Sequence, residues 1–226
     1  MNILIFGATG MVGQSVLREC LLDPQINNVV SIGRSATQQT QSKFREHVVK
    51  DITNLSSLTD ELSSIDACFF CLGVSSVGMS EEKYHAITYD LTMSIANTLV
   101  NIQPQMTFIY VTGASTDSTE QGSSMWARVK GKTENALLKL PFKSAFMFRP
   151  GAILPKNGVK SKTKLYQTFI VILSPIFPLL HKWFPNSVID SEQIGRAMIS
   201  VARDGYPKAI LESTDIREAS GRSKRF

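Results

Sequence analysis

The sequence is poor in the features that mark secreted and nucleic-acid-binding proteins. It has only three cysteines in 226 residues, an odd and low number that argues against a disulfide framework and for a reducing compartment. No basic stripe with interleaved aromatic side chains accompanies the net charge of +5, so we expect no nucleic-acid partner. The opening residues MNILIFGATG lack a basic lead before an apolar run, so we predict no signal peptide and expect a cytoplasmic location.

Long uninterrupted apolar runs are also missing. The most apolar stretch, residues 165–184, contains Pro175, Pro178 and Lys182, and its unbroken core is too short to span a bilayer. We therefore predict no transmembrane segment. Three interpretations of this stretch stay open: an apolar substrate pocket, a homodimer contact, or a contact with a membrane surface.

What the sequence does contain is a regular alternation of short apolar runs with longer segments of helical period. This alternation predicts a doubly wound, mostly parallel α/β sheet with helices on both faces, in one domain over residues 1–226. Residues 152–190 break the pattern and are expected to form an irregular segment on the substrate side. The predicted strands are 2–6, 29–32, 47–49, 67–71, 107–112, 145–149 and 208–212, and the predicted helices are 12–22, 55–62, 81–101, 125–140 and 191–204.

A glycine-rich turn follows the first predicted strand. Gly7, Gly10 and Gly13 have the spacing G-x-x-G-x-x-G between an apolar strand and an amphipathic helix. Gly7 suits a tight turn, Gly10 lets a phosphate approach the backbone, and Gly13 lets the helix pack closely on the sheet. Free N–H groups at the helix start favour an anion, so a dinucleotide is predicted here. The predicted pyrophosphate loop consists of Gly7, Ala8, Thr9, Gly10, Met11, Val12 and Gly13.

The end of the second predicted strand lacks an acidic residue. NAD-preferring folds place an acid there to bind the ribose hydroxyls, but residues 25–44 contain no Asp or Glu. The sequence SIGRS instead offers Arg34, whose guanidinium matches a phosphate bidentately. We therefore predict NADP as the cofactor, with NAD as the less favoured alternative.

Several motifs together resemble the short-chain dehydrogenase/reductase superfamily in its extended and atypical branches. These are GATGMVG, VVKD, CFFCLG, FIYVTGAS, a W-x-x-x-K spacing and FRPG, which cover residues 1–151. The chain is most similar to the small atypical reductases that bind NADP(H), some of which are described as oxidoreductases and some as regulatory proteins.

The resemblance implies further cofactor contacts. Asp51 would accept a bond from the adenine amino group with help from Ile52, although Asp51 could instead cap a helix. The remaining implied contacts, along the ribose and nicotinamide side, are Leu72, Gly73, Val74, Arg149, Pro150, Gly151 and Ala152.

The catalytic centre departs from the family pattern. The family uses a tyrosine four residues before a lysine, and a serine or threonine after the fifth strand. Lys130 matches the lysine, but Trp126 stands at the tyrosine position. Gly113 takes the usual hydroxyl position, and Thr112 and Ser115 flank it as possible substitutes.

Each of these residues carries a specific expectation. Lys130 is predicted to bind the nicotinamide ribose, while Trp126 either contacts the substrate or packs as an ordinary core aromatic. Tyr84 and Tyr89, on the helix predicted before this region, are alternative sources of a phenol. No metal site is predicted.

Two functions are compatible with this pattern. One is an NADP(H)-dependent oxidoreductase acting on a small, partly apolar carbonyl-type substrate. The other is a non-catalytic NADP(H)-binding regulator.

Overall fold

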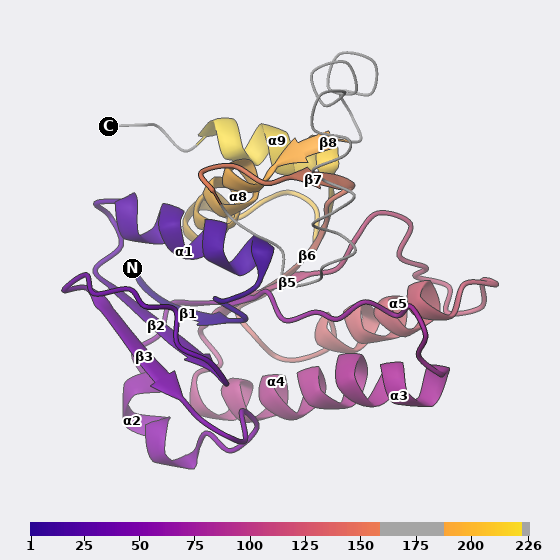
Figure 1. The fold of residues 1–226 in the computed structure, drawn as a ribbon, viewed down its shortest axis with the longest axis horizontal. Helices are drawn as coiled ribbons and strands as arrows, with labels where there is room; N and C mark the ends of the chain where they lie inside the picture. Colours follow the sequence, from indigo (N-terminus) through magenta and orange to yellow (C-terminus); the bar gives the residue numbers. More distant parts are fainter. Residues whose placement is uncertain (159–187, 223–226) are drawn as a thin grey trace.

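The computed structural model describes residues 1–158 and 188–222, and its centre is a seven-stranded parallel sheet. The strand order is β3-β2-β1-β4-β5-β6-β9, so the chain starts in the middle and winds outward in both directions (Figure 1). This confirms the predicted doubly wound fold and puts the topological switch point between β1 and β4. The strands are β1 (Asn2–Phe6), β2 (Asn28–Gly33), β3 (Phe44–Val48), β4 (Ala67–Phe70), β5 (Thr107–Val111), β6 (Ser144–Arg149) and β9 (Ile210–Glu212).

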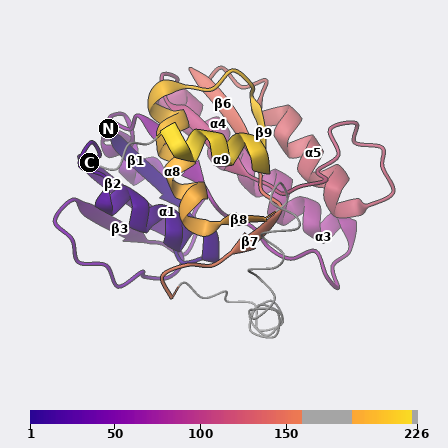
Figure 2. The same cartoon turned by 90° about the horizontal axis from the view of Figure 1, so that it is seen from above.

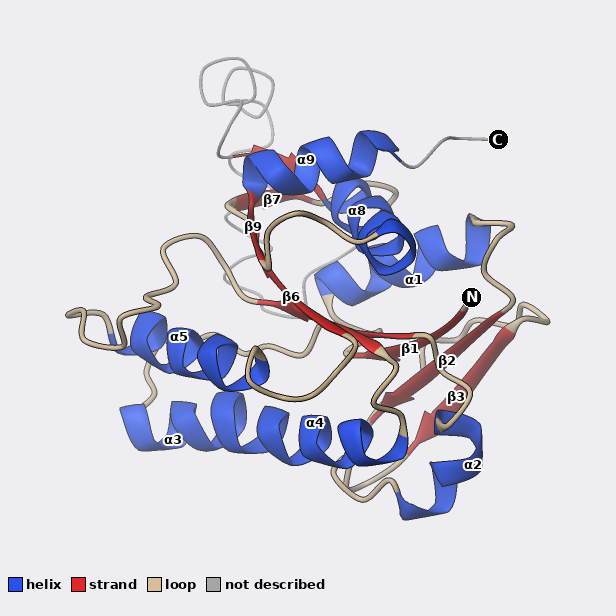
Figure 3. Cartoon of the chain, turned by 180° about the vertical axis from the view of Figure 1, so that it is seen from behind, coloured by secondary structure: helices blue, strands red, loops and turns tan. Residues whose placement is uncertain are grey.

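Helices cover both faces of the sheet. On one face lie α1 (Met11–Leu22), α8 (Ser191–Asp204) and α9 (Ser213–Arg222), and on the other lie α2 (Thr59–Leu62), α3 (Glu81–His85), α4 (Leu91–Ile102) and α5 (Met125–Leu137) (Figures 1 and 3). A 3-10 turn, η1 (Ser56–Leu58), precedes α2, and a π-helical turn, η2 (Ala86–Asp90), joins α3 to α4. Seen from above, α8 lies between α1 and α9 on their common face of the sheet (Figure 2).

Two apolar layers hold these elements together. Central strands are buried on both faces and read as continuous apolar runs, as parallel strands should. Alternate residues of β1 serve different layers, since Ile3 and Ile5 pack under α1 and α8 while Leu4 and Phe6 pack over α4. Because the central strands are fixed from both sides, the loops at their carboxyl ends have a rigid support.

Several boundaries differ from the sequence prediction. The third strand runs from Phe44 to Val48 rather than over 47–49, and the helix predicted over 81–101 contains the π turn η2. Helix α9 was not predicted, because its sequence STDIREASGR has only Ile216 and Ala219 as apolar side chains buried against the sheet.

The segment 152–190, expected to be irregular, begins and ends in regular structure. Residues Ala152–Leu154 form β7 and residues Val188–Asp190 form β8, and the two strands pair in parallel as a separate small sheet. The apolar stretch 165–184 lies outside the described residues. In the described ranges, no helix is both long enough and apolar enough to cross a membrane.

Candidate functional site: a dinucleotide groove at the switch point

The glycine loop between β1 and α1 is fixed by two close backbone approaches. Gly7 has φ 82°, and a Cβ there would lie 2.8 Å from the backbone of Cys71 and Leu72. At Gly13 a Cβ would lie 2.0 Å from the Gly7 carbonyl oxygen, so only glycine lets α1 start this close to the strand. A Cβ at Gly10 would meet only that same oxygen, at 3.3 Å. Packing therefore requires Gly7 and Gly13, and leaves Gly10 free to serve a ligand.

The start of α1 is suited to an anion. Gly10 is the N-cap and therefore offers no side chain to the first-turn N–H groups, and that turn contains no acidic residue. The helix dipole and these amides together favour negative charge at this point. A pyrophosphate fits this cradle, as the sequence predicted.

Two adjoining cavities run along the carboxyl ends of the strands from this loop. The smaller, about 100 Å³, is lined by Gly7, Ala8, Thr9, Ser31, Gly33, Arg34, Ser35, Ile52 and Leu72. The larger, about 400 Å³, is lined by Arg34, Lys50, Asp51, Ile52, Leu72, Gly73, Val74, Tyr84, Ala86, Ile87, Thr88, Leu91, Thr92, Tyr110 and Lys130. Arg34, Ile52 and Leu72 border both, so the two form one groove. Ten of the predicted cofactor residues line this groove: Gly7, Ala8, Thr9, Arg34, Asp51, Ile52, Leu72, Gly73, Val74 and Lys130.

The outer end of the groove carries charged side chains. Arg34 and Lys50 are exposed and follow β2 and β3, respectively. Asp51 lies beside them and accepts bonds from the Thr53 amide at 2.9 Å and the Thr53 hydroxyl at 2.6 Å. These bonds, the hydroxyl first, lower the pKa of the Asp51 carboxyl, which stays ionised as an acceptor. Asp51 caps none of the described helices, so the capping alternative is not supported.

The inner end of the groove holds a lysine and two tyrosines in a largely apolar wall. Lys130 lines it and donates from Nζ to the carbonyl oxygen of Thr112 at 2.8 Å. Burial lowers the pKa of Lys130 to about 8, against a smaller opposing effect of Glu134. The phenol-bearing side chains Tyr84 and Tyr110 border the same cavity, and burial raises the pKa of both.

The two alternative phenols separate clearly in the structure. Tyr84 lies in the cavity that Lys130 lines, next to the π turn η2. Tyr89 packs instead against His85, with ring centroids 4.7 Å apart, and beneath Lys132. Turns of π-helix are rare and often mark functional sites, and here η2 supplies Ala86, Ile87 and Thr88 to the cavity wall.

The predicted hydroxyl candidates do not reach the groove as free groups. The Thr112 hydroxyl donates to Glu134 Oε1 at 2.6 Å, in a buried setting, and is also 3.1 Å from the Phe148 carbonyl oxygen. Ser115 is exposed and has φ 66°. Neither lines the two cavities described above, so the expectation that one of them replaces the missing hydroxyl is not supported.

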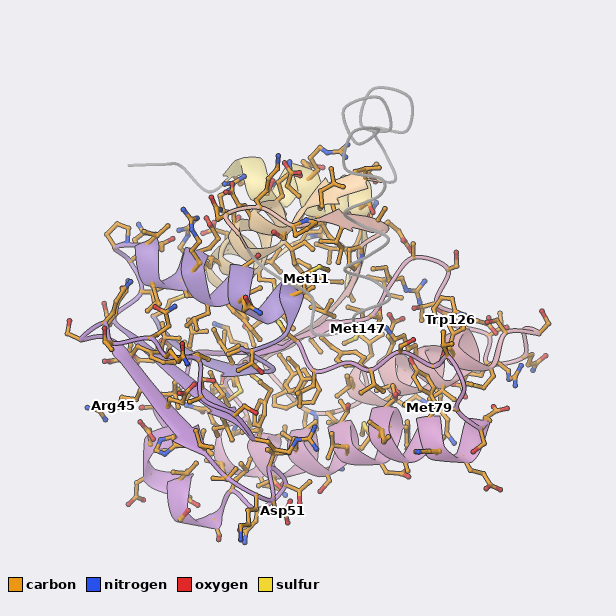
Figure 4. All side chains as sticks on the ribbon, viewed as in Figure 1. Met11, Arg45, Asp51, Met79, Trp126 and Met147 are labelled. Atoms are coloured by element: carbon orange, nitrogen blue, oxygen red, sulfur yellow. The ribbon has the colours of Figure 1, made fainter. Side chains whose placement is uncertain are left out.

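Trp126 lies at the start of α5, partly buried, and does not border either cavity. Figure 4 shows it well separated from Asp51, at the opposite end of the site. Trp126 therefore lies one helical turn before Lys130 on α5, outside the groove that the two described cavities form.

Arg149 serves a different purpose from the one predicted. Its guanidinium forms a buried ion pair with Glu134, which is fully buried, and also contacts the Ser118 hydroxyl at 2.5 Å. Because this pairing engages Arg149 inside the protein, its side chain is not free to bind a cofactor. Glu134 was not among the predicted site residues, although its position one helical turn after Lys130 on α5 is a signal that points to it.

The turn after β6 is likewise tied to the fold. The Pro150 carbonyl oxygen accepts from the Ala114 amide at 2.9 Å, and the Gly151 amide donates to the Ser213 hydroxyl at 2.8 Å. Ala152 begins β7. These four residues from Arg149 to Ala152, with Met11 and Val12, do not border the two cavities described above.

Comparisons with known proteins agree with this geometry. A family model described as the NAD-binding domain of semialdehyde dehydrogenase matches residues 2–92, the part that carries the glycine loop and the outer groove. Protein fmp52-1 of Aspergillus terreus is 23% identical over 209 residues, covering 88% of this chain and 86% of that protein. Protein fmp52 of Aspergillus fumigatus is 26% identical over 208 residues, with the same coverage.

Solved structures share the fold. The WbmF enzyme of Bordetella bronchiseptica in complex with NAD+ superposes with a TM-score of 0.67 at 16% identity, covering 98% of this chain and 77% of that one. A short-chain dehydrogenase/reductase of Saccharomyces cerevisiae superposes with a TM-score of 0.63 at 18% identity, covering 99% of both chains. The chain thus has the Rossmann-type fold of these proteins, in agreement with the motifs that resemble the short-chain dehydrogenase/reductase superfamily, and its residues 2–92 match a nucleotide-binding domain.

One expectation is overturned by the same comparisons. The fungal fmp52 proteins carry the designation mitochondrial in their names. The expected cytoplasmic location is therefore wrong. The prediction failed because a low cysteine count reports a reducing environment and does not distinguish one such compartment from another.

Proposed function

We propose that this chain binds NADP(H) along the groove and acts as an oxidoreductase on a small, partly apolar carbonyl-type substrate. The observation that carries the proposal is the continuity of the groove. It joins the glycine loop that leads into α1, a cationic outer end and the partly buried Lys130 within one pair of adjoining cavities. The proposal takes residues 1–226 as one domain, with 152–190 on the substrate side.

NADP is favoured over NAD by the outer end of the groove. Arg34 is exposed at the end of β2 and makes no hydrogen bond or ion pair that is evident among residues 1–158 and 188–222. An unpaired guanidinium in this place suits a 2′-phosphate, which accepts two parallel bonds from it. The backbone near Gly73 leaves room for the adenosine, because a Cβ there would meet no atom within 4 Å.

The residues of this chain would divide the work as follows. The amides at the start of α1 hold the pyrophosphate, Asp51 accepts from the adenine amino group, and Lys130 donates to the ribose on the nicotinamide side. When bound, the nicotinamide supplies the hydride. Tyr84 and Tyr110 are the two buried phenols that share the cavity with Lys130 in the described structure, and Tyr84 is the one adjoining the π turn η2.

A second function is favoured by specific observations. Trp126 replaces the tyrosine, Gly113 has no hydroxyl, and the Thr112 hydroxyl is already bonded to Glu134. A site that keeps the cofactor contacts and lacks the usual proton donor fits a regulator whose partner senses bound NADP(H).

Two measurements test the proposal in order. Titration calorimetry is expected to show NADPH binding at least about tenfold more tightly than NADH, since a charge-assisted hydrogen bond contributes about 1.5 to 3 kcal/mol. Oxidation of NADPH is then followed with aldehydes, ketones and quinones. Turnover supports the oxidoreductase, and tight binding without turnover on the whole panel favours the regulator. Equal affinity for the two cofactors would contradict the choice of NADP.

A further inference from the structure

Two cations end adjacent strands at the outer end of the groove. Strands β2 and β3 run in parallel with Gly33 beside Val48, and the Val49 amide donates to the Gly33 carbonyl oxygen at 2.9 Å. The pairing thus continues to the point where the strands end. Arg34 is the first residue after β2 and Lys50 is the second residue after β3, and both border the larger cavity.

Neither cation forms an ion pair in the described structure. Among the described residues, Asp51 is the one acidic side chain that lines this cavity, and its single negative charge, with Oδ1 accepting both bonds from Thr53, leaves an excess of positive charge beside Arg34 and Lys50. No ion pair of Arg34 or Lys50 occurs within residues 1–158 and 188–222. By contrast, Arg45, two residues before His47 on β3, pairs with Glu61 at 3.5 Å. Arg45 does not line the cavity.

Like charges on one cavity wall repel each other, and a ligand with more than one negative charge relieves that repulsion. A phosphate monoester carries about −1.5 to −2 charges near pH 7, whereas the ribose hydroxyl of NAD carries none. The planar guanidinium of an arginine binds two oxygens of a phosphate monoester side by side. The compact ammonium of a lysine can then bind the third free oxygen.

We propose that Lys50 is a second specificity-determining residue, which binds the cofactor 2′-phosphate together with Arg34. This inference rests on the proposed NADP(H) function and extends it to a residue outside the glycine, Arg34 and Asp51 positions. Lys50 contributes through the phosphate and not through the adenine or the pyrophosphate, so its effect is confined to ligands that carry the 2′-phosphate.

The test compares matched ligands and matched variants. Affinities of the full chain for NADPH, NADH, adenosine 2′,5′-bisphosphate and adenosine 5′-monophosphate are measured by calorimetry for the wild type, Lys50→Met, Lys50→Arg and Arg34→Met. Arg45→Met is the control, because it removes a charge from the same strand outside the cavity. Circular dichroism checks that each variant is folded, which an exposed side chain such as Lys50 should permit.

The expected result is a loss of about tenfold in affinity for NADPH and for the bisphosphate in Lys50→Met, as for one charge-assisted contact. NADH and the monophosphate should bind as they do to the wild type, and Lys50→Arg should restore most of the loss. Arg45→Met should leave all four affinities within about twofold. Raising the salt concentration should weaken NADPH binding less in Lys50→Met than in the wild type.

Three outcomes would overturn the inference, and they differ in what else they affect. If the wild type prefers NADPH and Lys50→Met keeps that preference, Lys50 has no part in it and the NADP(H) function stands. If Lys50→Met weakens NADPH and NADH equally, Lys50 contacts the shared adenosine half. If the wild type binds neither dinucleotide, the proposed function and this inference fail together.

Discussion

Replacing Lys130 by Met tests the energetics of the inner groove. The pKa of Lys130 is lowered from 10.5 to about 8, mainly by burial. Each pKa unit corresponds to about 1.4 kcal/mol, so keeping this amine charged in the fold costs about 3 kcal/mol. Methionine has similar length and no charge, but it loses the bond to the Thr112 carbonyl oxygen, which is worth about 1 kcal/mol. Near pH 7 we therefore expect Lys130→Met to be more stable than the wild type by about 2 kcal/mol.

The pH dependence has a definite sign. Because the folded pKa of Lys130 lies below its unfolded value, the unfolded chain holds more protons between about pH 8 and pH 10.5. Stability rises with pH wherever the unfolded state binds more protons. The destabilising effect is thus fully present below about pH 8 and fades as pH rises through the folded pKa. From about pH 7 to about pH 9.5 the wild type should gain about 2 kcal/mol relative to Lys130→Met.

Urea unfolding at both pH values, in the absence of cofactor, measures the difference. Lys139→Met is the control, because that lysine lies exposed just beyond the end of α5. Parallel stability curves for the wild type and Lys130→Met across this pH range would refute the argument that the amine is buried at a cost. Lys130→Met should also bind NADPH more weakly. In the proposed function the Lys130 ammonium donates hydrogen bonds to the cofactor ribose, and methionine has no donor to replace them.

Three further predictions concern the glycine loop and the buried ion pair. Gly13→Ala should destabilise the fold by about 3 kcal/mol or more in urea unfolding, because its Cβ would lie 2.0 Å from the Gly7 oxygen. Gly10→Val should remain folded by circular dichroism and lose dinucleotide binding, and normal binding would make the loop merely structural. Glu134→Ala should cost about 3 kcal/mol in urea unfolding, because the buried Arg149 would keep only its longer ion pair with the exposed Glu212, at 3.5 Å, and the double variant with Arg149→Met should recover much of it. If the double variant is no more stable than Glu134→Ala, the poorly compensated charge of Arg149 is not the cause.

The parts of the site that the sequence predicted are those that depend on local backbone chemistry. The Gly7 turn and the close approach at Gly13 each need a residue without a side chain, so the spacing alone locates the loop. Arg34 was predicted from its place directly after the second strand, and Lys130 from the W-x-x-x-K spacing that resembles the family pattern. For the glycine loop and for these two side chains, the sequence pattern lies within a few residues of the position that it predicts.

The parts that were missed depend on contacts between distant segments. The buried ion pair between Glu134 and Arg149 joins α5 to β6. The Thr112 hydroxyl donates a hydrogen bond to the same Glu134 carboxylate. No local pattern states that these three side chains meet, so Thr112 and Arg149 were assigned to the ligand instead. Lys50 was overlooked for the same reason, since its proximity to Arg34 comes from the parallel pairing of β2 with β3.

These contacts limit which side chains near Lys130 can replace the missing tyrosine as a proton donor. Trp126 is partly buried one helical turn before Lys130, and an indole donates a hydrogen bond but does not exchange a proton as a phenol does. The Thr112 hydroxyl is held by Glu134, so it does not orient a substrate oxygen. Gly113, by contrast, has room for a side chain, because a Cβ there would meet only the Pro150 carbonyl oxygen, at 4.0 Å.

The double variant Gly113→Ser, Trp126→Tyr should therefore create or raise carbonyl reductase activity, and Trp126→Tyr alone should do so to a smaller extent. The new phenol would stand one turn from the Lys130 ammonium, which lowers a phenol pKa, and general acid catalysis contributes about a hundredfold to ten-thousandfold. Steady-state oxidation of NADPH with a carbonyl panel measures the gain, and Trp126→Phe is the control, since it changes the ring without adding a hydroxyl. A wild type with robust turnover that Trp126→Tyr diminishes would contradict this reasoning. The indole would then contribute directly to substrate binding, and the proton would have to come from another group, of which Tyr84, in the cavity that Lys130 lines, is the first to test.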